Sequence, residues 1–306
     1  NISDAAHTLY SSQPGISKQI KLLEQELHLT LFVRNGRNLT GLTPAGEKIM
    51  QLAVEILNKT DDIHQIAQDS NKQHGVLAVA TTHTQARYIL PDVVRRFIDC
   101  FPEVSLNLQQ GTPLQVAKLA SLGDVDLAIA TEAVEGFDNL LTMPCYQWNR
   151  WVVVNNGHPL TDLPVLGMKD IVKYPIITYV YGYTGRYKLD EAFKAANLEP
   201  NIVLTAVDAD VIKTYVKLGL GVGIIANMAF DRREDEGLIS LDARHLFGTS
   251  ITHIALRKDK FIRDYIYKFI ETFAPHLDDG VVKRAMSCSS VKERKKMFEE
   301  FVIPSY

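Results

Sequence analysis

The 306-residue sequence has few cysteines and no long hydrophobic run. Its three cysteines, Cys100, Cys145 and Cys288, are an odd and widely spaced set, which argues against a disulfide framework or a zinc site and favours free thiols in a reducing compartment. No stretch approaches the ~18 consecutive apolar residues of a membrane-spanning helix. No basic-then-apolar secretory signal opens the chain. These absences predict a cytoplasmic protein that does not enter a membrane.

Excess positive charge is also absent, because 33 lysines and arginines face 36 aspartates and glutamates, for a net charge of −3. A globally basic coat for nucleic acid is therefore excluded, but a local basic surface is not. Any argument for DNA binding must depend on where the cations lie. Apolar residues make up 46% of the chain, enough to form cores. The length predicts about two domains.

The first 42 residues have the pattern of a helix-turn-helix followed by a hairpin. Residues 2–9 predict a short helix, and Ser12 is a suitable N-cap for a second helix that runs to about Leu27. One face of this second helix is apolar and the opposite face is polar and cationic. Residues 31–42 predict a hairpin with its turn at Asn35–Gly36. A hairpin in this position is a wing, so the pattern predicts a winged helix-turn-helix.

Polar groups on this module are suited to contact DNA. Gln13 can bond adenine bidentately, and Lys18 and Lys21 lie one helical turn apart, within reach of phosphate or guanine. Any one of these residues is equally well explained as an ordinary solvated side chain. As a set, in this setting, they indicate DNA binding. The predicted DNA-binding residues are Ser12, Gln13, Pro14, Ser17, Lys18, Lys21, Arg34 and Arg37.

A long helix is predicted to begin at Thr43 and Pro44, an N-cap followed by proline at the first position. Apolar or small residues then recur at spacings of 4-3-4-3-4, about three heptads of a dimer seam. The alternative is a surface helix that packs on its own domain. Residues 43–74 are thus predicted to form a linker and dimerisation helix with a polar hinge. The seam residues are Ile49, Ala53, Ile56, Thr60, Ile63 and Ala67.

Strands and helices alternate over residues 75–306, which predicts two α/β lobes with parallel sheets. Lobe I is expected at about 75–144 and 250–276, and lobe II at about 145–249. The charged tail, 277–306, is expected to be a solvated helix with an exposed end. Ligands of such folds bind at the carboxyl ends of strands, here in the cleft between the lobes.

Threonines follow the predicted strands where such a ligand would bind. Thr82 and Thr84 lie between a buried strand and a helix, where hydroxyl and free backbone N–H groups form an anion cradle. Thr131 ends another strand of the same lobe, and Thr184 offers a hydroxyl from the facing lobe. The alternative is that these threonines are only caps and strand ends.

Other patterns are weaker. The glycines of residues 219–223 lie between a helix and a strand, the reverse of a dinucleotide loop. Asp208 and Asp210 are interpreted as caps of the helix that begins there. His83 has no serine or cysteine nucleophile beside it, and the nine histidines show no metal spacing. We therefore predict no catalytic residue and no metal.

The segments Ser12–Ile20 and Leu42–Gly46 resemble the winged helix-turn-helix of LysR-type transcriptional regulators, and the resemblance covers nearly the whole chain. Within that family, Ala80–Tyr88 and Thr205–Ala226 are similar to activators of sulfur assimilation and cysteine biosynthesis. The resemblance implies an α+β fold. It consists of an N-terminal winged helix-turn-helix with a linker helix, then a two-lobed α/β effector domain of the type II periplasmic-binding-protein kind. It also implies a first helix ahead of Asn1.

The resemblance further implies ligands and partners. Acetylserine would be the inducer, sulfate or thiosulfate would occupy the same cleft, and no cofactor is expected. Promoter DNA, RNA polymerase and a homodimer that assembles into a homotetramer are the implied partners. The rival hypothesis is a bilobed solute-binding protein for a sulfur-containing anion, which has no use for residues 1–68; an enzyme is a weaker third. The implied effector-binding residues are Thr82, Thr84, Gln85, Thr131, Trp148 and Thr184.

Overall fold

The computed structural model describes residues 1–35, 38–68 and 75–306. The chain divides into two compact units, Asn1–Ser70 and Asn71–Tyr306. Among the helices so described, none has the length and apolar character needed to cross a membrane. All three cysteines are free thiols.

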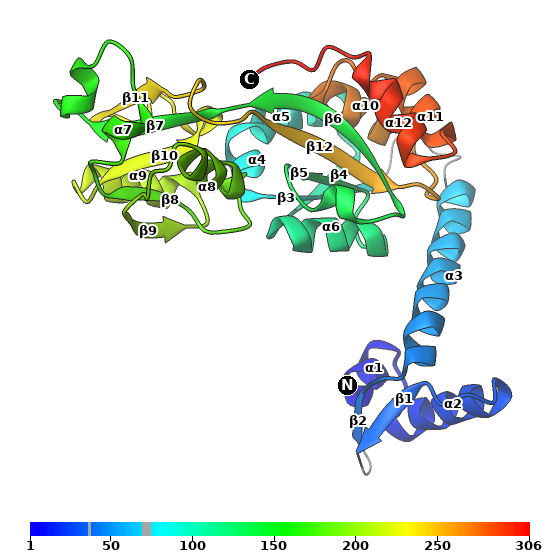
Figure 1. Cartoon of the computed structure of the whole chain (residues 1–306). Helices are drawn as coiled ribbons and strands as arrows, with labels where there is room; N and C mark the ends of the chain where they lie inside the picture. The colour runs from blue at the N-terminus through cyan, green and yellow to red at the C-terminus, as the bar shows by residue number, and fades with distance from the viewer. Residues whose placement is uncertain (36–37, 69–74) are drawn as a thin grey trace. The chain divides into compact units, whose positions relative to one another are not determined.

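The first unit contains the predicted helix-turn-helix, the strands of the hairpin and the long helix (Figure 1). The Ser12 hydroxyl accepts a hydrogen bond from the Gly15 N–H at 3.2 Å and so caps the second helix. The two hairpin strands pair antiparallel, and the predicted turn at Gly36 lies outside the described residues. The elements are α1 (Ile2–Thr8), α2 (Gln13–Glu26), β1 (Phe32–Asn35), β2 (Asn38–Leu42) and α3 (Pro44–Gln68).

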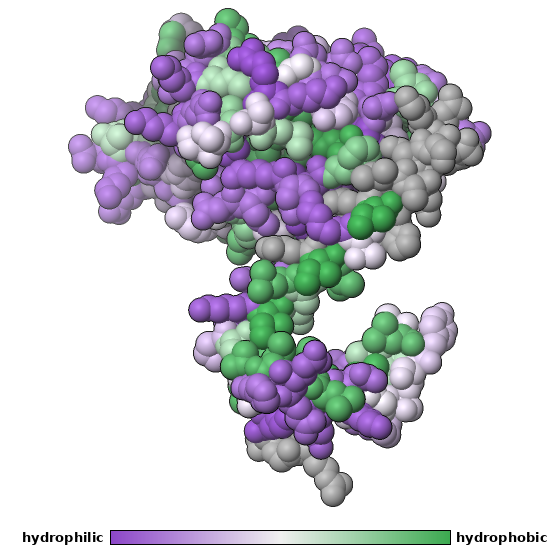
Figure 2. Space-filling model, turned by 90° about the vertical axis from the view of Figure 1, so that its right-hand side faces the viewer, coloured by the Kyte–Doolittle hydropathy of each residue, from purple (hydrophilic) through white to green (hydrophobic). Residues whose placement is uncertain are grey.

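Large apolar side chains gather on the surface of α3, where Figure 2 shows a hydrophobic strip. Ile56 and Ile63 of the predicted seam are each 67% exposed. The other described elements of the first unit therefore do not cover them, which favours the dimer seam over a helix packed on its own domain. The side chain of Ala67 lies outside those described.

The second unit has two five-stranded sheets, one in each lobe, with helices on both faces (Figure 1). Lobe I has the strand order β4-β3-β5-β12-β6, and lobe II has β11-β7-β10-β8-β9. The lobe I strands are β3 (Gly75–Thr81), β4 (Val104–Gln110), β5 (Leu127–Ala130), β6 (Leu140–Trp148) and β12 (Ser250–Arg257). The lobe II strands are β7 (Arg150–Asn155), β8 (Ile176–Tyr179), β9 (Ile202–Ala206), β10 (Val222–Ala226) and β11 (Leu238–Asp242).

Apolar helix faces cover both sheets and form the cores. In lobe I, Phe97 and Phe269 meet edge to face with ring centroids 5.5 Å apart. In lobe II there are two apolar clusters, and helix residue Phe193 is buried in one and helix residue Ile212 in the other. The helices of lobe I are α4 (His83–Tyr88), α5 (Leu90–Cys100), α6 (Pro113–Leu122) and α10 (Asp264–Phe273), with the 3-10 helix η1 (Val134–Gly136). Those of lobe II are α7 (Met168–Ile171), α8 (Arg186–Ala195) and α9 (Ala209–Lys217), with the 3-10 helices η2 (Pro159–Asp162) and η3 (Asn227–Ala229).

The prediction of parallel sheets is wrong, because both sheets are mixed. In lobe I, β12 runs antiparallel to both β5 and β6. In lobe II, β7 runs antiparallel to both β10 and β11. The antiparallel strands are those next to the crossings between lobes, where β6 leads into β7 and β12 returns. The predicted return of β12 to lobe I is confirmed.

The prediction of a solvated helix in the tail is also wrong, although Val302 and Tyr306 at its end are exposed. The tail folds into α11 (Asp279–Ser287) and α12 (Val291–Glu299), and Ser305 then pairs with Gln147. Val282 and Phe298 are buried in the core of lobe I. The sequence did not predict this burial, because charged residues occupy the other positions of the same helices and make the segment look solvated.

Candidate DNA-binding and effector-binding sites

The predicted DNA-binding residues lie on α2 and the wing of the first unit. Gln13, Lys18 and Lys21 are exposed, and Pro14 is in the first turn of α2. Ser17 is half-buried, and the Ser12 hydroxyl serves as a cap. Two cations one helical turn apart with open access to solvent are suited to bind phosphate. Arg37 lies outside the described residues.

Glu24 fixes the wing to α2. One carboxylate oxygen of Glu24 accepts hydrogen bonds from the backbone N–H groups of Leu31 at 2.9 Å and Phe32 at 3.3 Å. The other accepts from the Arg34 guanidinium at 2.8 Å. Burial pushes the pKa of Glu24 up, but these hydrogen bonds outweigh it and leave the pKa below its usual value. Arg34, predicted to contact DNA, is thereby oriented by a carboxylate.

We expect Glu24→Ala to weaken operator binding by about 1–3 kcal/mol, because it frees the start of the wing and Arg34 together. Amide hydrogen exchange should quicken at Leu31 and Phe32, which lose their acceptor. Glu26→Ala is the matched control, since Glu26 is exposed on the same helix. Fluorescence anisotropy on promoter DNA measures the affinity. Equal affinity and equal exchange in the two variants would contradict a positioning role for Glu24.

In lobe I, a chain of polar side chains joins α4 to β6, β12 and the residue that follows β5. The Gln85 side chain donates to the Thr252 hydroxyl at 3.4 Å and accepts from the Tyr146 hydroxyl. The Thr131 hydroxyl lies 3.3 Å from the same Thr252 hydroxyl. Two of the predicted effector residues, Gln85 and Thr131, thus share one partner on β12.

Arg150 is the largest charged group at the junction of the lobes. It is 2% exposed. Its Nη2 atom donates to the carbonyl oxygens of Thr184 at 3.1 Å and Gly185 at 2.7 Å, and to the Ser250 hydroxyl at 3.3 Å. Its guanidinium also lies 5.0 Å from the ring centre of Trp148. Burial lowers the pKa of Arg150 to about 10, so it stays charged at neutral pH.

A carboxylate from lobe I meets the same segment of lobe II. Glu132 accepts a hydrogen bond from the Gly185 N–H. Burial raises the pKa of Glu132 to about 7, although the Gly185 hydrogen bond and the charge of Arg150 both lower it. Near neutral pH Glu132 is therefore ionised in only part of the molecules and does not fully neutralise Arg150.

The remaining predicted residues lie around this junction. Thr84 on α4 is buried, and its side chain lies near enough to Tyr179 on β8, in the facing lobe, to lower the pKa of that tyrosine against the larger rise caused by burial. Thr82 precedes α4 without forming a side-chain cap, and no contact places it in the network. Trp148 is buried, and its indole N–H has no hydrogen-bond partner among the described residues. The structure brings Thr84, Gln85, Thr131, Trp148 and Thr184 to the junction; we call these five, with Glu132, Arg150 and Thr252, the interlobe site.

Sequence reasoning missed Glu132, Arg150 and Thr252. A weak signal was present for Arg150, since a lone arginine begins an otherwise apolar strand, Arg150–Asn155. Lone charges in apolar strands are rare unless they are paired. Thr252 and Glu132 carried no comparable signal, because their roles depend on strand neighbours far apart in the sequence.

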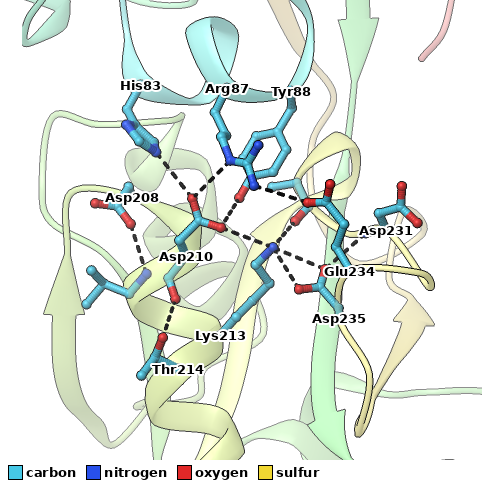
Figure 3. A network of polar contacts seen from close by, with 12 residues as sticks. His83, Arg87, Tyr88, Asp208, Asp210, Lys213, Thr214, Asp231, Glu234 and Asp235 are labelled. Atoms are coloured by element: carbon cyan, nitrogen blue, oxygen red, sulfur yellow. Dashed lines mark hydrogen bonds and ion pairs between the residues drawn. The ribbon is translucent and has the colours of Figure 1, made fainter. Parts of the chain in front are cut away.

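A second polar network, the interlobe bridge, joins α4 to α9 and the loop 231–235 (Figure 3). Asp210 accepts from the Tyr88 hydroxyl at 2.8 Å and lies 3.4 Å from the His83 ring and 3.8 Å from Arg87. Lys213, which is buried, lies 3.4 Å from Asp210 and 2.9 Å from Asp235. The bridge therefore links the two lobes through side chains alone.

The interpretation of the two aspartates as caps holds for Asp208, which accepts from the Val211 N–H at 2.9 Å. Asp210 points instead to lobe I, as Figure 3 shows. Ligand atoms of His83, Asp208 and Asp210 lie close enough together to hold a metal. Arg87 and Lys213 already neutralise Asp210, so we assign this cluster to the bridge and not to a cation.

A winged helix-turn-helix, a long helix with an apolar strip and a bilobed domain define a DNA-binding protein that responds to a small molecule. The chain matches the model of the bacterial regulatory helix-turn-helix proteins of the lysR family over residues 1–47. It matches the LysR substrate binding domain over residues 70–278. The chain therefore belongs to the LysR family of transcriptional regulators, which are not enzymes.

Individual proteins similar to this chain support the family assignment. The chain is 50% identical over 300 residues to the HTH-type transcriptional regulator CysB of Haemophilus influenzae, covering 98% of this chain and 93% of the relative. It is 49% identical over 283 residues to the HTH-type transcriptional regulator SsuR of Burkholderia cenocepacia, covering 92% of each. Among solved structures, the cofactor-binding domain of the Cbl transcriptional regulator matches with a TM-score of 0.68 and 43% identity, covering 71% of this chain and 96% of that one. The family assignment does not favour the rival solute-binding protein.

Proposed function

We propose that this regulator controls genes of sulfur assimilation and cysteine biosynthesis in the cytoplasm. Its effector binds at the interlobe site, with acetylserine as inducer and sulfate or thiosulfate as competing anions. Similarity to CysB over 98% of the chain supports this proposal. The observation that supports it is the interlobe site. There the Arg150 guanidinium contacts Trp148 and the Thr184 carbonyl, and Gln85 and Thr131 share Thr252 as a partner.

The chemistry of the interlobe site suits a small oxyanion. Threonine hydroxyls and the unpaired indole N–H of Trp148 offer neutral donors. Arg150 supplies positive charge but its Nη2 donors are already engaged, so it favours an anion through its field rather than through a direct ion pair. Hydrogen-bond count then discriminates between ligands.

On the DNA side we propose that Gln13, Ser17, Lys18 and Lys21 of α2 contact the operator, with the wing residues Arg34 and Arg37 at phosphates. A pair of α3 helices would form the dimer, and two dimers the tetramer. The effector shifts the equilibrium between assemblies with different spacing of their DNA-binding units, which changes contact with RNA polymerase. Only an effector with unequal affinity for the assemblies can act in this way.

Thr84→Val tests the effector site. The change keeps the shape of the side chain and removes one hydroxyl, so a bound ligand oxygen would lose its partner. We expect acetylserine affinity to fall by about 1–3 kcal/mol, roughly ten- to a hundredfold. Calorimetry on the full chain measures this. Promoter DNA should still bind, but acetylserine should no longer alter the complex.

Thr272→Val is the matched control, because the Thr272 hydroxyl donates to the Lys268 carbonyl within α10, away from the interlobe site. Its affinity for acetylserine should equal that of the wild type. If Thr84→Val binds acetylserine and sulfate as tightly as the control, the effector binds elsewhere and the threonines only support the fold.

A further inference from the structure

Lobe I contains a cavity that is separate from the interlobe site. It has a volume of about 350 Å³ and lies between η1, β6, β12 and α12. Small-molecule sites in proteins begin at about this size. Apolar side chains form much of its wall, among them Phe137, Leu140, Ile251 and Phe298.

Arg294 of α12 lines this cavity and is 5% exposed. Among the described residues, no hydrogen bond or ion pair joins its guanidinium to another side chain or carbonyl. The other buried cations all have partners: Arg150 has carbonyl oxygens, Lys213 has Asp235, and Arg257 has Asp259. A buried charge without a partner is costly, so the Arg294 guanidinium offers unused N–H donors and a positive charge to an anion in the cavity.

A second polar side chain, that of His253, also lines the cavity. Its buried Nδ1 atom has no hydrogen-bond partner among the described residues. Ile251 and His253 line the cavity from β12, whereas Thr252 between them bonds Gln85 and Thr131 of the interlobe site. Alternate residues of a strand face opposite sides of a sheet. The cavity and the interlobe site therefore share a strand but lie on opposite faces of it.

The charges around the cavity restrict the class of ligand that it can bind. Lys295 pairs with Glu135 at 3.7 Å on the rim, while Asp138 and Glu299 also line the cavity. Acidic neighbours repel a multiply charged anion, and the apolar wall needs an apolar ligand surface. A single negative charge on a short hydrocarbon chain meets both conditions.

We propose that this cavity binds a small organic monoanion, a carboxylate or sulfonate with a short apolar chain, whose acid group pairs with Arg294. The apolar chain of the ligand lies against Phe137, Leu140 and Ile251. Sulfate, which is divalent and has no apolar part, is excluded from this cavity.

Calorimetry with butane-1-sulfonate and butanoate on the full chain tests the proposal and distinguishes the two acid groups. Both probes, or one of them, should bind saturably, whereas sulfate and 1-butanol should not compete. Arg294→Met keeps most of the apolar stem and removes the charge, so probe affinity should fall by roughly tenfold or more. Without probe, the variant should unfold at a higher temperature than wild type, because an unpaired buried charge is removed.

Lys296→Met is the matched control, an exposed cation on the same helix, and should bind the probe like wild type. Thr84→Val should also bind it, which separates this cavity from the interlobe site. If Arg294→Met fails to fold, Val291→Trp takes its place, because Val291 is 47% exposed and lines the cavity. The proposal is overturned by the absence of saturable binding to wild type, by unchanged binding in the folded Arg294 or Val291 variant, or by loss of binding in Thr84→Val.

Discussion

The double variant Ile56→Glu with Ile63→Glu is expected to convert the regulator to monomers. Both side chains are 67% exposed in the chain and lie on the predicted seam of α3. In a dimer each glutamate would be buried opposite its own copy across the two-fold axis, at a cost of several kcal/mol. A protein that grips two half-sites gains about 10²- to 10⁴-fold in affinity from bivalence, so operator affinity should fall by a factor of that order.

Analytical ultracentrifugation gives the assembly state, and anisotropy on promoter DNA gives the affinity. Gln51→Glu is the control, because Gln51 is exposed on the outer side of the same helix and receives the same charge. It should leave both readouts unchanged. An unaltered sedimentation coefficient in the double variant would mean that α3 packs within its own subunit.

Gly185→Ala is expected to destabilise the protein and to disrupt the interlobe site. Gly185 has a φ of +63°, which costs alanine about 1–2 kcal/mol. Its new Cβ would also overlap the Nη2 atom of Arg150 and lie 2.9 Å from the Ser250 hydroxyl. Displacing the buried guanidinium from its acceptors adds about 3–5 kcal/mol.

Gly182→Ala separates the two effects. Gly182 also has a positive φ, +84°, but a Cβ there meets nothing within 4 Å. The Gly182→Ala variant should lose only the backbone contribution of about 1–2 kcal/mol to its free energy of unfolding, and it should keep its effector affinity. Urea unfolding and acetylserine calorimetry on both variants give the comparison. Similar losses in the two would show that Arg150 has room to move and does not organise the site.

Local patterns of the sequence predicted most of the elements. The N-cap Ser12, the apolar spacing of α2 and the Thr43–Pro44 start of α3 are short-range signals, and the structure has a helix at each place. Strand direction was not predictable in this way. The direction of β12 relative to β6 depends on which lobe the chain has just left. The two strands are far apart in the sequence, so local patterns do not reveal their pairing.

In the candidate site, too, residues marked by local sequence position could be predicted, whereas residues that depend on long-range contacts could not. Threonines next to strand ends could be found by their position, because the carboxyl ends of strands are a general place for ligands. Glu132 and Arg150 could not, since their importance lies in the approach of both to Gly185. Arg294 was hidden for another reason: in a lysine-rich helix it looks like one more solvated cation, and only its burial sets it apart.

The interlobe bridge stabilises the arrangement of the two lobes seen in the structure. Contacts from Asp210 to Tyr88 and from Arg87 to Glu234 favour the arrangement of the lobes seen here through the protein's own side chains. A two-state sensor populates each arrangement according to its free energy, with or without effector. The strength of the bridge therefore sets the free energy that any rearrangement of the lobes would cost. An effector that acts by rearranging them would have to supply that free energy through the difference in its affinity for the two arrangements.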